Sequence, residues 1–551
     1  MNTEETNVDV ADARQEDKDA EPKEAADPAK VAADADATEA DVSEADLDQE
    51  EQEKQPITGG GVEAAEALSS AMDEPPAEKN GSVKLKIIEE AGDAKFTGLN
   101  KEELLRVAGG PGWVRARWGL LLVFWLGWLG MLVGAVIIIL QAPGCRELPT
   151  TNWWNDGPLY RIGNIHAFSD MQNLKGVEQK INSLSKLKVK GLVVGPIHVA
   201  PPDEDMRLRF EEVSPDAGNL DQFKSLIQTA HKKGISVVLD LTPNYQGTSG
   251  PWFSSSSVTN VAERLKSALV FWLNEGVDGI QLLGVEYVAS EVPSLWTDIR
   301  AIVQNGTDKY PNNKVLIGVT ESSSAENVSA LLSSTGVDLL ISRVLSSGAT
   351  DATGRAQVIQ DLYYSHSQTK LAWSLGGQGG GHIASLVGQA NVKLYQLLLM
   401  TLPGTPIFSY GDEIGLMDKG TKFPKMQWDE ELNETLQEEL AERQSCRNFF
   451  RSVSELRGKE WSLLFGDFTL LSNSSSSMAY LRVWDQSDRY LAAFNWAAEE
   501  AAVLLSGAAV PPHATLVFST NSSVLPGSRV DLANLRLGPG QAALIKYPYG
   551  E

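Results

Sequence analysis

The sequence is poor in cysteine: Cys145 and Cys446 are the two cysteines among 551 residues. This scarcity excludes a small secreted scaffold held together by disulfides, so the fold must depend on a large hydrophobic core. The length exceeds what one core usually holds, and a barrel with one or two further modules is the expected organisation.

The N-terminal part also lacks aromatic and basic residues. No Phe, Trp or Tyr precedes Phe96, and residues 1–82 contain 25 Asp and Glu against 6 Lys and Arg. Such a segment cannot bury enough apolar surface to offset the entropy lost on ordering. We predict that residues 1–95 form a disordered acidic tail, which either only solvates the chain or docks a partner. For a chain of net charge −26 we expect no nucleic-acid partner.

Charge is absent from residues 119–140, GLLLVFWLGWLGMLVGAVIIIL. A helix of this length spans about 33 Å, the thickness of a bilayer core. A cleaved signal peptide would be shorter and would lie near the N-terminus. We therefore predict an uncleaved transmembrane helix at 119–140, embedded in membrane lipid. A juxtamembrane segment at 96–118 precedes it and an extracellular neck at 141–158 follows it.

Basic residues flank this span unevenly. The 20 residues after Leu140 contain only Arg146, whereas the 20 before Gly119 contain Lys101, Arg106, Arg115 and Arg117. Basic residues favour the cytoplasmic side, so the sequence predicts a single-pass type II protein with a cytoplasmic N-terminus. N-glycosylation sequons are then usable only beyond the span. Asn80 lies on the wrong side, and the sequons beyond the span are at Asn305, Asn327, Asn433, Asn473 and Asn521.

The two cysteines lie in different surroundings. Cys145 follows the span by five residues, in APGCRELP. An exposed thiol in an oxidising compartment is expected to become oxidised, and here the membrane restricts which partner reaches it. Cys446 lies in the helical pattern AERQSCRNFFRSV and is predicted to be a buried apolar residue. An internal bridge between the two cysteines stays open as the alternative.

Beyond the neck, β-branched runs alternate with helical stretches. Eight such runs predict a (β/α)8 barrel over residues 159–455: LYRIGNIHAF, GLVVGPIHV, ISVVLDL, GIQLL, KVLIGVT, DLLIS, KLAWSL and TPIFSY. From about Trp461 the pattern changes to short alternating strands such as MAYLRVW and RYLAAFNW, which predict an antiparallel β-sandwich over 456–551. The predicted fold class is α/β, with a single transmembrane helix before the barrel and the sandwich.

Several of these segments resemble the α-amylase family of retaining glycoside hydrolases. The resemblance rests on KGLVVGPI, ISVVLDLTPNY, GVDGIQLLGV and above all LLLMTLPGTPIFSYGDEIGL. It implies a barrel whose active site lies at the C-terminal ends of the strands. Retaining hydrolysis needs two carboxylates roughly 5 Å apart, one as the nucleophile and one as the general acid.

The resemblance also implies which positions should carry that chemistry, and most are altered. Gln281 stands where the family has an arginine, and Leu283 stands where it has the aspartate nucleophile. Leucine cannot form a glycosyl ester. Asp240 and Asn244 keep the family pattern after the third strand, but Tyr245 replaces its substrate-contacting histidine. We therefore expect no enzyme.

One position of the resemblance stays ambiguous. Glu321 corresponds to the general acid, unless counting from Gly318 puts Val319 there. The family's His-Asp pair is missing from WSLGGQGGGHIAS, where His382 has no aspartate after it. We expect neither a cofactor nor a metal site.

A second resemblance covers the chain from about Lys95 to the C-terminus. KFTGLNKEELLRVAGGPGWVRARW, CRELP, LYRIGN and LDLTPNY are similar to the 4F2-type heavy subunits of heteromeric amino acid transporters. This resemblance implies a glycoprotein of the plasma membrane that pairs with a multi-spanning light chain through a disulfide at Cys145 and supports its surface expression. It also implies a link to integrins through the tail and span.

Three functions from different classes compete at this point. A membrane-anchored α-glucosidase requires a nucleophile that Leu283 cannot supply. A carbohydrate-binding receptor requires the sugar-clamping residues that the barrel lacks. A transporter subunit accounts for the span, the juxtamembrane cysteine and the altered site together. One helix cannot form a translocation path, so transport would belong to the partner.

Overall fold

The computed structural model describes residues 100–550, apart from 143, 151, 308–309, 312–313, 347–350, 377–380, 429–436 and 506–509. The predicted acidic tail, Asn80 and Asn433 lie outside the described residues. The chain divides into two units, Met1–Val114 and Arg115–Glu551, and each is described by itself.

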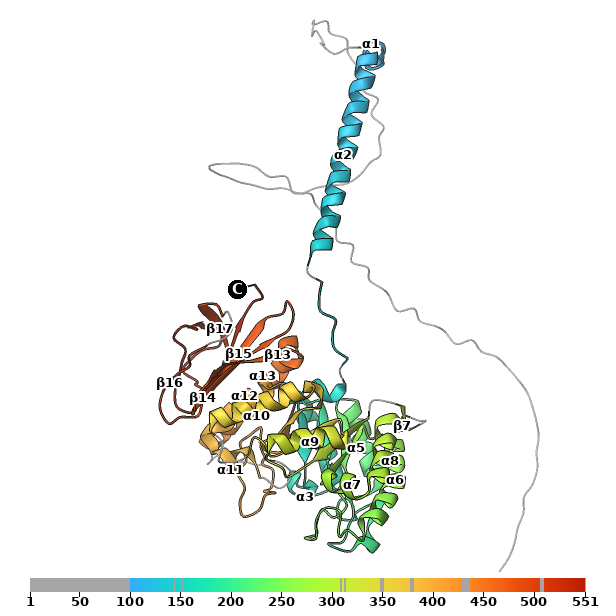
Figure 1. Ribbon diagram of the computed structural model, residues 1–551, viewed down its shortest axis with the longest axis vertical. Coiled ribbons are helices and arrows are strands. Elements are labelled where there is room, and N and C mark those ends of the chain that lie inside the picture. The colour runs from blue at the N-terminus through green and yellow to red at the C-terminus, as the bar shows by residue number, and fades with distance from the viewer. Residues whose placement is uncertain are drawn as a thin grey trace, which may run out of the picture. The chain divides into compact units, whose positions relative to one another are not determined.

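Two helices begin the described chain (Figure 1). Helix α1 (Lys101–Ala108) starts at Asn100, whose side chain accepts a hydrogen bond from the backbone N–H of Lys101. Helix α2 (Pro111–Gln141) contains the predicted span, and Pro111 fits its first turn because a proline there loses no helical hydrogen bond. Among the described residues α2 is the one helix long and apolar enough to cross a membrane.

Eight parallel strands form the centre of the second unit, in the order β10-β9-β6-β5-β2-β1-β12-β11. An isolated parallel bridge between Leu340 and Leu371 joins the two ends and closes the ring. Each of the eight predicted runs contains a barrel strand, although the end of LYRIGNIHAF forms a helix at Ile165–Phe168. The barrel strands are β1 (Leu159–Ile162), β2 (Gly191–Val194), β5 (Ser236–Asp240), β6 (Gly279–Leu283), β9 (Val315–Val319), β10 (Leu339–Ile341), β11 (Ala372–Trp373) and β12 (Thr405–Ser409).

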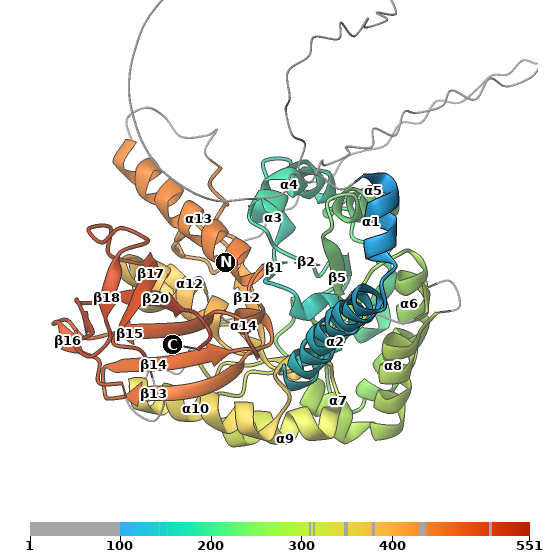
Figure 2. The same cartoon turned by 90° about the horizontal axis from the view of Figure 1, so that it is seen from above.

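Helices surround these strands, as Figure 2 shows from above. Short polar side chains start several of them: Asn173, Asn219 and Asp351 each accept a backbone N–H at the helix N-terminus. The helices are α3 (Ile165–Phe168), α4 (Leu174–Lys186), α5 (Leu220–His231), α6 (Val258–Asn274), α7 (Val285–Glu291), α8 (Pro293–Asn305), α9 (Ala325–Thr335), α10 (Ala352–Ser365), α11 (Ile383–Val387), α12 (Val392–Thr401), α13 (Gln437–Arg457) and α14 (Trp461–Leu464).

Two small hairpins interrupt the barrel, and of their strands only β3 (His198–Val199), at the end of the run GLVVGPIHV, falls within a predicted strand. The hairpins pair β3 with β4 (Arg209–Val213), and β7 (Gly306–Thr307) with β8 (Tyr310–Pro311). The strands β7 and β8 have two residues each, too few for a periodic pattern, and along β4 buried and exposed residues do not alternate strictly.

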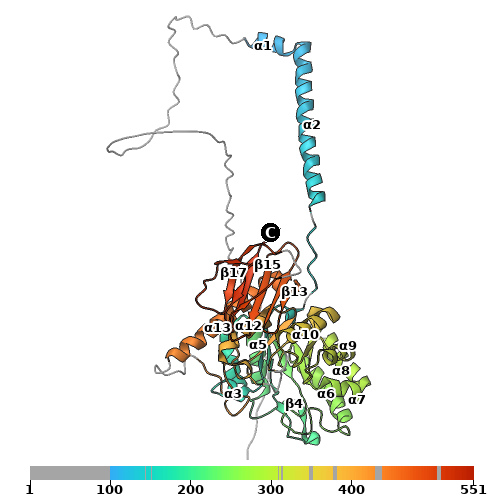
Figure 3. The same cartoon turned by 60° about the vertical axis from the view of Figure 1, so that its left-hand side comes forward.

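The C-terminal part is an antiparallel β domain, as predicted (Figure 3). Its main sheet has the order β13-β14-β15-β20-β17-β18, and a two-stranded sheet pairs β16 with β19. The strands are β13 (Asp467–Asn473), β14 (Ser477–Val483), β15 (Arg489–Asn495), β16 (Ala501–Ala502), β17 (His513–Ser519), β18 (Arg529–Asp531), β19 (Arg536–Leu537) and β20 (Ala542–Tyr547).

The two faces of the main sheet enter different cores. Tyr480 and Phe494 join the large core shared with the barrel. Leu481 and Leu491 belong to a separate core that includes Leu537 of the small sheet. This alternation of neighbours along β14 is the period-two pattern of a strand buried on both faces.

Two buried arginines lie at the C-terminus of α12: Arg457 of α13, and Arg482 of β14, which joins the β domain to the barrel. Nη1 of Arg457 donates to the carbonyl oxygens of Met400 and Leu402, at 2.6 and 3.2 Å. Nη1 of Arg482 donates a hydrogen bond to the carbonyl oxygen of Thr401 at 2.8 Å. Burial lowers the pKa of Arg457 to about 9 and that of Arg482 to about 10. Both side chains thus satisfy carbonyl groups that a helix end leaves without helical partners.

Candidate functional site

A cavity of about 530 Å³ lies at the C-terminal ends of the barrel strands. Its walls include five of the six residues at the predicted active-site positions: Asp240, Asn244, Tyr245, Leu283 and Glu321. The sixth, Gln281, lies buried behind them on β6. The cavity therefore occupies the place where a barrel of this kind carries its active site.

Asp240 is the last residue of β5 and lies opposite Gln281 of β6 in the strand register. Its Oδ2 accepts a hydrogen bond from Nε2 of Gln281 at 2.6 Å. Its Oδ1 accepts two from Thr242, from the backbone N–H at 2.9 Å and from the hydroxyl at 2.6 Å. Burial raises the pKa of Asp240, although these donors act in the opposite direction. Both carboxylate oxygens thus serve contacts within the protein.

Leu283 ends β6 and gives the cavity an aliphatic wall. Its backbone is fixed on both sides, because its N–H donates to the hydroxyl of Thr242 at 3.1 Å and its carbonyl accepts from Nε1 of Trp252 at 2.8 Å. The side chain has no atom that can attack an anomeric carbon. Leu283 therefore contributes an apolar surface to the cavity and no nucleophile.

The structure distinguishes the two candidates for the general acid. Val319 ends β9 and is fully buried in the core. Glu321 lies two residues further and lines the cavity, with 49% of its side chain exposed. Its Oε2 lies 3.1 Å from Nη1 of Arg343 in an exposed ion pair. Such a pair is solvated and contributes little to stability.

Asn244 and Tyr245 hold the loop beside the cavity. Nδ2 of Asn244 donates to Oδ1 of Asp203 at 2.9 Å and to the carbonyl oxygen of Gly250 at 2.9 Å. Tyr245 is half-buried, and its hydroxyl donates to the carbonyl oxygen of His198 at 3.1 Å. Hydrogen bonds from Ser249 and Asn244 hold the pKa of Asp203 well below its usual range. These side chains are occupied in shaping the loop.

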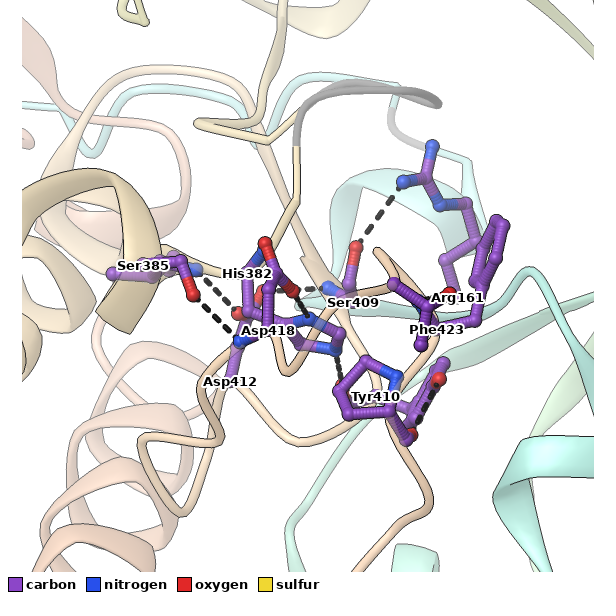
Figure 4. A network of polar contacts seen from close by, with 11 residues as sticks. Arg161, His382, Ser385, Ser409, Tyr410, Asp412, Asp418 and Phe423 are labelled. Atoms are coloured by element: carbon purple, nitrogen blue, oxygen red, sulfur yellow. Dashed lines mark hydrogen bonds and ion pairs between the residues drawn. The ribbon is translucent and has the colours of Figure 1, made fainter.

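The region of His382 contains a polar network whose acidic members sequence reasoning missed (Figure 4). The ring is buried, with Nδ1 2.6 Å from Oδ1 of Asp418 and Nε2 2.8 Å from the carbonyl oxygen of Tyr410. Asp412 accepts hydrogen bonds from the backbone N–H groups of Ile383 and Ser409. His382 is not among the residues that line the large cavity. A histidine thirty or more residues from its carboxylates leaves no local motif, so no sequence signal pointed to this pair.

The predicted modification sites lie on the surface. Cys145 is exposed and Cys446 is buried, and both thiols are free, so the internal bridge is not formed. The described sequon asparagines, Asn305, Asn327, Asn473 and Asn521, are all exposed. Among the described residues no group of three or more His, Cys, Asp and Glu side chains could hold a metal ion.

Comparison with known proteins gives the same two resemblances. Residues 84–160 match the family model "Solute carrier family 3 member 2 N-terminus", and residues 163–261 match "Alpha amylase, catalytic domain". The trehalulose synthase MutB of Pseudomonas mesoacidophila has a similar structure, with a TM-score of 0.59 and 17% identity over 72% of this chain and 100% of MutB. At this identity the likeness shows the fold alone.

Two curated relatives are much more similar in sequence. The "Amino acid transporter heavy chain SLC3A2" of Oryctolagus cuniculus is 42% identical over 522 residues, which cover 91% of this chain and 96% of the rabbit protein. The protein of the same name from Rattus norvegicus is 42% identical over 528 residues, with the same coverage. The chain belongs to the family of amino acid transporter heavy chains.

Proposed function

We propose that this chain is the non-catalytic heavy subunit of a heteromeric amino acid transporter. In this proposal it pairs through a disulfide at Cys145 with a multi-spanning light chain and supports the surface expression, stability and transport of that partner. The span and the unequal flanking charges support a cytoplasmic N-terminus and a barrel outside the plasma membrane. The integrin link implied by the resemblance concerns the tail and the span, and residues 1–99 lie outside the described residues.

The observation that carries the proposal is the position of Cys145. Its thiol is exposed, and it follows the last residue of α2, Gln141, by four positions. Four residues of extended chain reach at most about 14 Å, so the thiol stays close to the membrane surface. A partner with transmembrane helices beside α2 would present its extracellular loops at this height.

The barrel supports a non-catalytic role. Leu283 offers no nucleophile, and Asp240 uses both carboxylate oxygens in contacts with Thr242 and Gln281. Glu321 and Asp216 are the other carboxylates that line the cavity, and neither stands on β6, where the resemblance puts the nucleophile of the two-carboxylate reaction. Removing a catalytic nucleophile typically lowers the rate by about 10⁴ to 10⁶.

The cavity itself favours one second candidate, a carbohydrate-binding receptor. A volume of about 530 Å³ is large enough for a small sugar. The side chains of Asp240, Asn244, Tyr245 and Glu321 are engaged with other groups of the protein, which leaves fewer groups to bind sugar hydroxyls. Direct titration of the purified chain with maltose by calorimetry would decide this: millimolar or tighter binding lost on Tyr245→Ala supports the receptor.

The test of the heavy-subunit proposal is non-reducing electrophoresis of the full chain from cell membranes. We expect a heavy species that collapses on reduction and that disappears in Cys145→Ser, while the variant still co-purifies with a multi-spanning protein in mild detergent. Tethering in one membrane already gives a high effective concentration, so packing should hold the pair without the covalent bond.

Cys446→Ser is the matched control. Burial raises the pKa of the Cys446 thiol to about 12, so its reactive thiolate is scarce and the heavy species should be unchanged. A heavy species that persists in Cys145→Ser and is lost in Cys446→Ser would contradict the assignment. Mass spectrometry of the reduced partner band would identify the light chain.

A further inference from the structure

The residue after Cys145 is attached to the β domain. The backbone N–H of Arg146 donates to Oδ2 of Asp485 at 3.1 Å, and its Nη1 lies 3.1 Å from Oδ2 of Asp467. The guanidinium also lies over the ring of Trp484, with Cζ 4.6 Å from the ring centroid. Three different interactions therefore converge on one residue of an otherwise extended neck.

The receiving surface is rigid. Asp467 begins β13 and pairs in register with Val483, the last residue of β14, so Asp467 lies beside Trp484 and Asp485 at the same end of the sheet. Trp484 is almost fully buried, and its backbone N–H donates to the hydroxyl of Ser462 at 3.2 Å. The contacts of Arg146 therefore hold the neck at a defined place on the folded β domain.

The neck stays attached beyond this point. Pro149 lines a cavity of about 110 Å³ together with Phe465 of the segment before β13. The carbonyl oxygen of Trp154 accepts a hydrogen bond from the Thr405 hydroxyl at 2.9 Å, at the start of β12. Arg146 is thus the first of several attachments after the span, and Cys145 is about 3.8 Å from it along the chain.

We propose that Arg146 is a positioning residue that fixes where the ectodomain presents the Cys145 thiol. The inference rests on the proposed disulfide with a light chain. A disulfide forms only when the two Cα atoms come within about 4.4–6.8 Å and the Cβ vectors face each other. Docking the next residue confines the thiol to a small volume and raises its effective concentration at a fixed partner cysteine.

The interactions are individually weak and act together. The ion pair is exposed, with 53% of the Arg146 side chain accessible, and such pairs contribute little alone. A guanidinium over a tryptophan ring and a backbone N–H bound to a carboxylate add to it. We expect Arg146→Ala to slow formation of the disulfide-linked species roughly three- to tenfold.

The experiment measures two things in the full chain. Pulse-chase labelling in cells, followed by non-reducing electrophoresis, gives the rate of disulfide linking. Hydrogen exchange of the neck peptide, in the purified Cys145→Ser chain in mild detergent, tests the attachment without any partner bond. Arg146→Ala and the double variant Asp467→Ala with Asp485→Ala should both slow linking and raise exchange roughly threefold or more.

Two controls sharpen the result. Arg146→Lys keeps the charge and the ring contact and should restore most of the linking rate. Arg536→Ala removes another exposed arginine of the β domain, paired with Glu500 at 2.9 Å, and should change neither measurement.

Each outcome decides the proposal. Equal exchange in wild type and variants would refute the attachment. Faster exchange with an unchanged linking rate would refute the positioning role. If the wild-type chain forms no reducible heavy species, the proposed disulfide fails and the positioning role fails with it, while the exchange result still decides whether Arg146 docks.

Discussion

Glu413 is a buried acid whose ionisation should make the stability of the protein depend on pH. It follows β12 in the segment SYGDEIGL and is 1% exposed. Its Oε1 accepts a hydrogen bond from the hydroxyl of Tyr160 at 3.1 Å, and within the described structure no hydrogen-bond donor reaches its Oε2. Burial raises the pKa of Glu413 to about 7, although the charge of Arg447 acts against this shift.

The sign follows from which state holds the proton. The pKa of Glu413 rises from 4.5 to about 7 on folding, so between these values the folded state keeps a proton that the unfolded state has lost. Stability therefore falls as pH rises through this window. Ionising the buried Glu413 therefore lowers the free energy of unfolding. This loss is absent below pH 4.5 and complete above pH 7, where it amounts to about 3 kcal/mol. Glu413→Gln removes it and keeps an acceptor for Tyr160.

The assay is thermal unfolding of the purified full chain in mild detergent, followed by tryptophan fluorescence at one fixed scan rate. For a folded region of this size, about 3 kcal/mol corresponds to a shift of about 4 °C. We expect Glu413→Gln to raise the midpoint by this amount at pH 8 and to leave it unchanged at pH 4.5. Glu499→Gln, at an exposed site, should have no effect at either pH. An equal shift at both pH values would show that packing, and not ionisation, is responsible.

Three other outcomes are expected. Leu283→Asp should not give measurable hydrolysis of an α-glucoside, because Gln281 and Tyr245 still replace the arginine and the histidine of the family pattern; wild-type turnover that disappears in Glu321→Gln would contradict the proposed non-catalytic role. Arg482→Ala should lower the free energy of unfolding by roughly 3 kcal/mol or more, measured by urea titration, because buried carbonyls lose their donor. Glycosidase treatment should lower the apparent mass of the cell-expressed chain, and an N-terminal tag should survive protease added to intact cells. Removing sequons one at a time should lower the mass at the described positions Asn305, Asn327, Asn473 and Asn521.

Sequence patterns predicted the barrel because each strand carries its own signal. A run such as GLVVGPI is buried on both sides and ends at a turn, so its length and composition alone identify a strand. The family pattern then located Asp240, Leu283 and Glu321 at one end of the barrel. Strand β4 escaped prediction because buried and exposed residues do not alternate strictly along it.

The contacts that fix the site were not predictable in the same way. Asp418 reaches His382 from 36 residues away, and Gln281 reaches Asp240 from 41 residues away. Such pairs depend on strand register and loop path, and the pattern of a single sequence records neither. The same reason hides the buried arginines, because nothing in the segment around Arg482 distinguishes it from the solvent-exposed arginines that are the general rule.

The neck combines a feature that the sequence predicts with a long-range contact that it does not. The sequence identified Cys145 by its distance from the span, which is a local property. Arg146, one residue later, meets Asp467 and Asp485 from 321 and 339 residues away. In the proposed arrangement the position of the thiol therefore depends on the β domain, which lies far from it in the sequence. A chain truncated before β13 would keep Cys145 and lose this attachment. If the disulfide depends on geometry as proposed, linking to a light chain should be slower without the folded β domain, even though no residue of that domain takes part in the bond.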